Sequence, residues 1–98
     1  MKVLISYDVS TVDPEGRSRL RRVARACKNY GARVQYSVFE CPLDPIRLAK
    51  LKAELQPLLN HDEDQVLFVS LGPTANDASL IIEAMGTPYQ MRSRVTIV

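Results

Sequence analysis

The stretch that decides the fold is residues 3–11, V-L-I-S-Y-D-V-S-T. Its first half has the apolar, β-branched character of a buried strand, and Asp8 stands where that strand should end. An aspartate at that point can terminate the strand, because its carboxylate bonds to nearby backbone N–H groups. It can also be a metal ligand held at the end of a scaffold strand, although the chemistry of a single aspartate favours the strand terminator. The residues further along the chain bear on this choice.

The composition is that of one globular domain spanning residues 1–98. Hydrophobic residues make up 46% of the chain and charged residues 24%, so we expect a folded core rather than disorder. No apolar run reaches the length of a signal segment or a membrane span, which predicts a cytoplasmic protein without membrane contact. Cys27 and Cys41 stand alone and fit no metal spacing, so we expect two free thiols.

A helix is expected soon after the opening stretch. Asp13 and Pro14 form a helix start, with the aspartate as N-cap and the proline at the first helical position. Gly31 stands where the residue just after a helix often adopts a left-handed backbone conformation. Between these ends, apolar side chains recur with helical spacing at Leu20, Val23, Ala24, Cys27 and Tyr30.

A strand and a second helix follow. Residues 33–41, R-V-Q-Y-S-V-F-E-C, predict a strand with a kink or bulge near Ser37. Asp44 and Pro45 repeat the helix-start signal, and Pro57 should bend or end the helix that they begin. The apolar stripe of this helix consists of Leu48, Leu51, Leu55 and Leu58.

Strand signals also fill the last third of the chain. Residues 66–71, V-L-F-V-S-L, indicate a buried strand, and residues 80–82 and 95–98 predict two more. The expected element order is therefore β-α-β-(β)-α-β with a C-terminal strand, in which the bracketed strand requires residues 33–41 to divide in two. This order is typical of the α+β, ferredoxin-like βαββαβ sandwich, in which an antiparallel sheet carries two helices on one face.

The two central strands predict a homodimer. If helices cover only one face of a sheet, its strands should alternate apolar and polar residues, but residues 3–5 and 66–69 are apolar throughout. A domain of this size has no third layer to cover the second face. A two-fold dimer that stacks sheet on sheet would cover it and would bring two Asp8 carboxylates together. Such a pair would suit Mg²⁺, which keeps several waters and often takes one or two protein carboxylates.

The first helix predicts a polyanionic partner. Positions 17 to 28 hold six basic side chains and no acidic one: Arg17, Arg19, Arg21, Arg22, Arg25 and Lys28. A solvated outer helix face is the alternative interpretation. Because like charges at i, i+4 spacing repel each other, we favour contact with nucleic-acid phosphates, with little sequence preference.

Other kinds of catalytic site find little support in the sequence. His61 is the only histidine and stands in a polar connection, which argues against Ser-His-Asp and Cys-His sites. The neighbouring acidic residues 62–64 could bind a cation, but a solvated loop is the favoured interpretation. The chain has neither a glycine-rich phosphate loop nor the aromatic signature of an RNA-recognition sheet.

Several of these features together resemble one known family. They are Y-D-V at residues 7–9, the basic helix, the element G-x-R-V-Q-x-S-V-F-E at residues 31–40, and the leucine-rich second helix. In order and spacing they are similar to the small CRISPR-associated adaptation protein family, the smaller partner of the integrase that inserts new spacers into a CRISPR array. The resemblance covers residues 2 to about 71.

The resemblance implies a ferredoxin-like homodimer whose C-terminal strand, about residues 94–98, packs on the partner sheet. It also implies that Asp8 binds Mg²⁺, or another divalent cation, at the dimer interface of a metal-dependent endonuclease or endoribonuclease. The substrates it implies are single-stranded RNA and duplex DNA. The protein partner that it implies is the larger CRISPR integrase.

Two functional hypotheses follow. In the first, a pair of Asp8 residues is the catalytic metal ligand of a phosphodiesterase, the basic helix holds the substrate, and the site is shaped by Tyr7, Ser10, Thr11, Ser37 and Phe39. In the second, the dimer is a non-catalytic scaffold that binds nucleic acid and bridges the integrase, and the Asp8 pair is structural. A regulatory dimer without nucleic acid is a third, weaker hypothesis.

Overall fold

The computed structural model describes residues 2–71 and 81–88, and the expected strand at residues 95–98 lies outside them. The chain runs through β1 (Lys2–Asp8), α1 (Pro14–Lys28), β2 (Ala32–Gln35), β3 (Val38–Pro42), α2 (Pro45–Leu55), the short 3₁₀ helix η1 (Gln56–Leu58), β4 (Gln65–Leu71) and β5 (Ile81–Gly86). None of the helices in these described ranges is long and apolar enough to cross a membrane.

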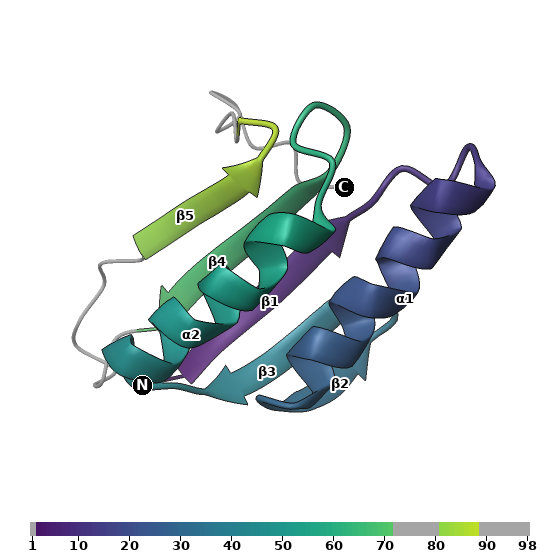
Figure 1. Ribbon diagram of the computed structural model, residues 1–98. Helices are drawn as coiled ribbons and strands as arrows, with labels where there is room; N and C mark the ends of the chain where they lie inside the picture. The colour runs from purple at the N-terminus through teal and green to yellow at the C-terminus, as the bar shows by residue number, and fades with distance from the viewer. Residues whose placement is uncertain (1, 72–80, 89–98) are drawn as a thin grey trace, which may run out of the picture.

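The strands form one antiparallel sheet in the order β2-β3-β1-β4-β5, with α1 and α2 side by side on one face (Figure 1). This confirms the α+β, ferredoxin-like fold. The opening stretch supplies the central strand β1, which pairs with β3 on one side and with β4 on the other. In the β4 ladder, Asp8 lies opposite Gln65, so the end of β1 meets the start of β4.

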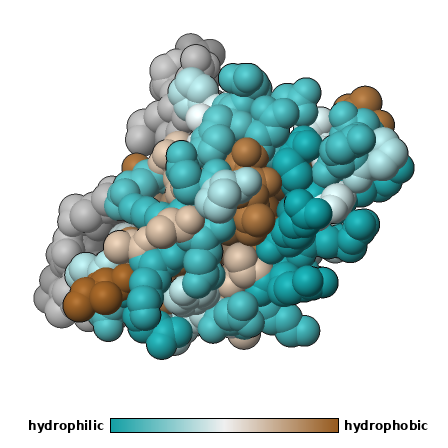
Figure 2. All heavy atoms as spheres, in the orientation of Figure 1, coloured by the Kyte–Doolittle hydropathy of each residue, from teal (hydrophilic) through white to brown (hydrophobic). Residues whose placement is uncertain are grey.

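The core lies between the sheet and the helices. Burial alternates along β1 and β4, although their sequences do not alternate: Val3 and Ile5 are fully buried, whereas Leu4, Leu67 and Val69 on the other face are only half-buried. The helices contribute a buried stripe, and in Figure 2 a hydrophobic strip is visible between them, beside a hydrophilic surface over α1. The main helical members of the core are Val23, Ala26, Cys27, Leu48, Leu51 and Leu55.

Both helix starts are those that the sequence predicts. The Asp13 carboxylate accepts a hydrogen bond from the Gly16 backbone N at 2.7 Å, and Asp44 accepts one from the Arg47 backbone N at 2.7 Å. Pro57 falls in the 3₁₀ turn η1 directly after α2, as expected for a residue that cannot donate to a helix.

Residues 33–41 form two strands instead of one bent strand, which confirms the βαββαβ order and corrects only the interpretation of this segment as continuous. They form a hairpin in which β2 and β3 are joined by a turn at Tyr36 and Ser37, with a register shift between Arg33 and Gln35. The irregularity near Ser37 was thus a chain reversal. The turn lacks the glycine or asparagine that is typical of a tight hairpin, so the sequence did not predict it.

Gly31 also differs from its prediction. The helix ends at Lys28 with Asn29 as C-cap, and Gly31 does not adopt a left-handed backbone. A Cβ atom at Gly31 would lie 2.2 Å from the Glu40 carbonyl oxygen and 2.6 Å from the Cys41 sulfur. The glycine is therefore needed for close approach to β3, not for its conformational freedom.

Candidate metal and nucleic-acid site

A hollow of about 420 Å³ opens where β1 ends. It lies between the β1–α1 connection, the first turns of α1 and the β2–β3 turn. Its lining brings together several residues that the sequence singled out, and its members are Tyr7, Asp8, Val9, Thr11, Arg17, Leu20, Tyr36 and Ser37. Elements far apart in the sequence therefore converge on Asp8.

Asp8 is exposed and lies on the sheet face that the helices leave open. Side chains alternate along a strand, so it shares that face with Leu4 and Ser6. None of the ion pairs within residues 2–71 and 81–88 includes Asp8. Among the described residues that line the hollow, no other carries a carboxylate. Asp8 is therefore available to a ligand rather than committed to the fold.

Tyr7 supports the hollow as a buried hydrogen-bond donor. Its hydroxyl donates to the Tyr36 carbonyl at 3.4 Å, and its backbone N donates to the Ser37 carbonyl at 3.1 Å. Burial raises the pKa of Tyr7, although the hydrogen bond and charge of Arg33 oppose the rise. The phenol therefore stays neutral near pH 7 and holds the β2–β3 turn beside Asp8.

The remaining predicted site-shaping residues divide into two kinds. Thr11 and Ser37 line the hollow. Phe39 is buried and outside it, and supports it indirectly by stacking on Tyr7 with ring centroids 6.1 Å apart. Ser10 is also outside it, and its backbone N donates to the Asp64 carboxylate at 3.1 Å.

One side of α1 carries a basic stripe, Arg17, Arg21, Arg25 and Lys28, spaced so that these exposed residues share one side of the helix. At its N-terminal end Arg17 lines the Asp8 hollow. At its C-terminal end Arg25 and Lys28 line a groove of about 630 Å³ against β2, together with Arg33, whose guanidinium lies 5.2 Å from the centre of the Phe39 ring. The stripe thus connects the hollow with a second basic pocket.

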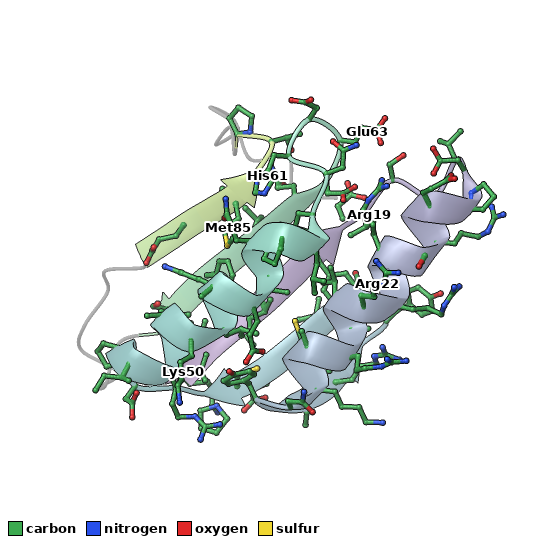
Figure 3. The ribbon with its side chains drawn as sticks, viewed as in Figure 1. Arg19, Arg22, Lys50, His61, Glu63 and Met85 are labelled. Atoms are coloured by element: carbon green, nitrogen blue, oxygen red, sulfur yellow. The ribbon has the colours of Figure 1, made fainter. Side chains whose placement is uncertain are left out.

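The other two basic residues of α1 point to the opposite side. Arg19 reaches the connection before β4, where its Nε lies 2.8 Å from Asp64 and its Nη2 lies 3.3 Å from Glu63 (Figure 3). Arg22 lines a separate hollow with Asn60 and His61. The structure therefore separates Arg19 from the residues predicted to hold nucleic acid, because its guanidinium is already bound within the fold.

The donors at the Asp8 hollow suit Mg²⁺ in kind. They are oxygen atoms, from the Asp8 carboxylate and the Thr11 and Ser37 hydroxyls, and hard cations prefer oxygen ligands. No group of three or more His, Cys, Asp or Glu side chains that could hold a metal occurs among the described residues. One chain thus offers a single carboxylate here, and water molecules or a second chain would have to supply the remaining metal ligands.

The two cysteines do not add chemistry to this site. Both are free and buried in the core. Burial raises the pKa of Cys27 to about 12 and also raises that of Cys41. Each is therefore a protonated thiol near pH 7, as expected of structural cysteines.

Three residues at or near the site were not singled out by the sequence analysis. Tyr36 and Arg33 stand in the segment predicted to be one strand, and only the hairpin turns them toward the hollow and the groove. Asp64 was assigned to a solvated loop, yet it is fully buried. No local signal marks Asp64, because its partner Arg19 lies 45 positions earlier in the chain.

Comparison with known proteins agrees with this geometry. The family model of the CRISPR associated protein Cas2 matches residues 1–78. The chain is 57% identical over 72 residues to the CRISPR-associated endoribonuclease Cas2 of Nitratidesulfovibrio vulgaris. The aligned region covers 74% of this chain and 71% of that protein. It is 51% identical over 72 residues to the CRISPR-associated endonuclease Cas2 of Halalkalibacterium halodurans, covering 74% and 75%.

Solved structures give the same answer. The crystal structure of Streptococcus pyogenes Cas2 at pH 6.5 superposes with a TM-score of 0.69 and 46% sequence identity, covering 74% of this chain and 87% of that one. A hypothetical protein from Thermus thermophilus superposes with a TM-score of 0.65 at 28% identity, covering 84% and 96%. On the sequence match, the fold and the conjunction of the Tyr7-Asp8 strand end with a basic helix, this chain belongs to the Cas2 family of CRISPR-associated proteins.

Proposed function

We propose that this chain is a divalent-metal-dependent endonuclease or endoribonuclease that acts in CRISPR adaptation. The observation that carries the proposal is the shared hollow of Asp8 and Arg17, which lies at one end of the basic stripe. A carboxylate and a guanidinium that line the same hollow, neither of them in an ion pair within residues 2–71 and 81–88, suit a metal ion and the phosphate that it acts on. The family membership of the chain supports the same assignment.

Each part of the hollow has a distinct role in this proposal. Asp8, with the Thr11 and Ser37 hydroxyls nearby, would hold Mg²⁺ or another divalent cation. The cation, when bound, supplies Lewis-acid polarisation of a phosphodiester and an activated water. Arg17 would hold the phosphate beside it, and the rest of the stripe would follow the nucleic-acid backbone. Tyr7 keeps its proton and its hydrogen bond to Tyr36, so it positions the turn and does not act as a base.

The open face of the sheet supports a homodimer. Leu4, Leu67 and Val69 lie half-buried there, on the same side of the sheet as Asp8. A second copy stacked on this face would cover them and would bring its own Asp8 toward the first one. The dimer would thereby add the carboxylate that a single chain lacks.

The substrate class follows from the charge of α1. Backbone phosphates are common to single-stranded RNA and duplex DNA, so the stripe suits either polymer and would show little sequence preference. A larger CRISPR integrase is the protein partner that we propose for the dimer, in keeping with a role in spacer acquisition. The dimer would then present the nucleic acid to that integrase.

One observation favours a second function, that of a non-catalytic scaffold. Within the described residues Asp8 has no companion carboxylate in its hollow, whereas the basic stripe is complete in a single chain. Binding of nucleic acid therefore requires less of the molecule than cleavage does. In this alternative the stripe carries the function and the Asp8 pair is structural.

A paired assay separates the two functions. Wild type, Asp8→Ala and the matched control Asp62→Asn, which changes an exposed carboxylate in the β4 approach, would each be incubated with single-stranded RNA and with duplex DNA. Each mixture would contain Mg²⁺ or a chelator and would be scored for binding and for cleavage. We expect cleavage by wild type and Asp62→Asn, its loss on chelation, and a loss of more than about 100-fold in Asp8→Ala with binding retained.

Two results would contradict the enzymatic proposal. One is cleavage by Asp8→Ala at the wild-type rate, which would remove Asp8 from the mechanism. The other is tight, salt-sensitive binding by wild type without any metal-dependent cleavage, which would establish the scaffold instead.

A further inference from the structure

Asp64 is a buried carboxylate at the same end of the sheet as Asp8, where β1 ends and β4 begins. It directly precedes β4, and its neighbour Gln65 lies opposite Asp8 in the β1–β4 ladder. Its side chain is completely buried. A buried carboxylate is costly unless it is paired and hydrogen-bonded, so the partners of Asp64 show what the fold gains from it.

Both carboxylate oxygens of Asp64 are fully engaged. Oδ1 accepts from the Ser10 backbone N at 3.1 Å and from Arg19 Nη2 at 3.4 Å. Oδ2 accepts from Arg19 Nε at 2.8 Å and from the Asn60 backbone N at 2.9 Å. We name this set, Asp64 with Ser10, Arg19 and Asn60, the Asp64 clasp. It joins the connection before β4 to the β1–α1 connection and to α1, whose Ser10 and Arg19 lie 54 and 45 positions before Asp64.

The clasp holds the two segments that carry the hollow. Ser10 lies in the connection that leaves Asp8 and continues to Thr11 in the lining of the hollow. Arg19 lies half a turn after Arg17 on α1, so its attachment fixes the part of the helix that presents Arg17. Figure 3 shows Arg19 directed from α1 toward the connection before β4. One carboxylate therefore bonds both to the segment that follows Asp8 and to the helix that carries Arg17.

The backbone of Asp64 is itself fixed by the sheet. Its carbonyl accepts a hydrogen bond from the Thr87 backbone N at 2.8 Å, at the end of β5. Gly86 allows this approach, because it has a φ of 86° and a Cβ there would lie 2.0 Å from the Asp64 carbonyl oxygen. The backbone of Asp64 is thus bonded to the residue after β5, while its carboxylate bonds to the two segments that lead to the hollow.

We infer that Asp64 is a positioning residue for the Asp8 hollow, holding the segment after Asp8 and the first turns of α1 in the geometry that metal and phosphate require. The inference rests on the proposed metal-dependent cleavage. Asp64 touches neither the reacting phosphate nor the metal in this assignment. It acts through Ser10 and Arg19, as outer hydrogen-bond partners orient metal ligands in other sites.

The test compares three variants with wild type in the Mg²⁺-dependent cleavage assay. Asp64→Asn keeps the size of the side chain and removes its charge. Arg19→Gln removes the charged partner while leaving the backbone contacts of Asp64 in place. Glu83→Gln is the matched control, because it breaks an ion pair between β5 and Lys52 of α2, on elements that do not line the hollow. All assays are run at a temperature where circular dichroism shows each variant to be folded.

The expected result is a selective loss of turnover. In Asp64→Asn we expect kcat to fall about 10- to 100-fold and the Mg²⁺ concentration for half-maximal rate to rise, with KM for nucleic acid unchanged. Amide hydrogen exchange at Ser10 should accelerate at the same time. Arg19→Gln should change kcat in the same direction without raising KM, and Glu83→Gln should match wild type. If Asp64→Asn fails to fold, Arg19→Gln carries the test alone.

Three outcomes overturn the inference, and the assay tells them apart. Folded Asp64→Asn or Arg19→Gln with wild-type kcat and Mg²⁺ dependence would reduce the clasp to a purely structural role, and an Arg19→Gln defect confined to KM would make Arg19 a nucleic-acid contact. Wild-type cleavage by Asp8→Ala, measured alongside, would instead remove the metal site that the clasp is inferred to position.

Discussion

Two aspartates lie at the same end of the sheet, but one is exposed and the other is buried. Asp8 ends β1, is exposed and belongs to no ion pair of the described chain. Asp64 precedes β4, is completely buried and accepts four hydrogen bonds. The side chains are identical, so the surroundings alone decide that one carboxylate is free to bind a ligand and the other is committed to the fold.

The same contrast appears between two arginines of α1. Arg17 is exposed in the hollow, whereas Arg19, two positions later, has only 15% of its side chain exposed and is bound to Asp64. A helix that turns by 100° per residue places such neighbours on opposite sides. A cluster of like charges in a sequence therefore need not have one function.

The sharpest test of the aspartate comparison is stability. Asp64→Ala would leave the Ser10 and Asn60 amides and the Arg19 guanidinium without their shared acceptor, and we expect it to lower the free energy of unfolding by about 3 kcal/mol. Asp8→Ala should change it by less than about 0.5 kcal/mol, because Asp8 is an exposed strand-end residue. Urea unfolding of both variants measures the difference. Equal losses would mean that Asp8 is also a structural residue.

The salt dependence of nucleic-acid affinity tests whether the exposed arginines of α1 bind phosphate. The triple variant Arg17→Ala, Arg21→Ala, Arg25→Ala removes most of the basic stripe, and each lost phosphate contact should reduce the slope of log affinity against log salt by about 0.9 for duplex DNA. The matched control Arg47→Ala, Lys50→Ala removes exposed charges from α2. We expect affinity to fall at least about tenfold in the triple variant and little in the control. An equal change of slope per charge removed in both variants would show that only net charge matters.

The smallest expected effect is on the pH dependence of stability. Burial of Asp64 would raise its pKa, but the hydrogen bonds from Arg19, Asn60 and Ser10 outweigh burial and lower it. A carboxylate whose pKa is lower in the folded than in the unfolded chain stabilises the fold fully above its ordinary pKa, and this stabilisation disappears as the pH falls through the lowered value.

Acid unfolding measures this contribution. Wild type should lose stability below about pH 4, the ordinary range of an aspartate, and Asp64→Asn should lose less over the same interval because it has no charge to lose there. Asp8→Asn serves as the control for removal of an exposed carboxylate. An identical loss of unfolding free energy at low pH in wild type and Asp64→Asn would contradict the role given to the clasp.

The sequence predicted those parts of the fold that depend on local chemistry. Asp13 and Asp44 predicted the starts of both helices, because an aspartate N-cap followed by proline can begin a helix without tertiary contacts. The hollow was predicted in part, through Asp8, Thr11 and Arg17, since a strand end and a basic helix are visible in the residues themselves.

The features that the sequence did not reveal depend on distant contacts. The hairpin turn at Tyr36 and Ser37 exists because β3 pairs with β1, and it has no residue that requires a turn. Strand β5 runs to Gly86, beyond the predicted residues 80–82, because pairing with β4 overrides the weak strand preference of Glu83 and Ala84. Asp64 lies in a run of acidic residues and becomes distinct only when Arg19 is folded against it.

The close approach of Gly31 to β3 has a consequence for how this chain can vary. Any side chain at position 31 would press on the Glu40 carbonyl and the Cys41 sulfur and would move the end of α1 away from β3. The groove between Arg25 and Arg33 would open with it. Position 31 is thus expected to tolerate almost no replacement in a library selected for function, while the exposed Ala32 beside it should accept many.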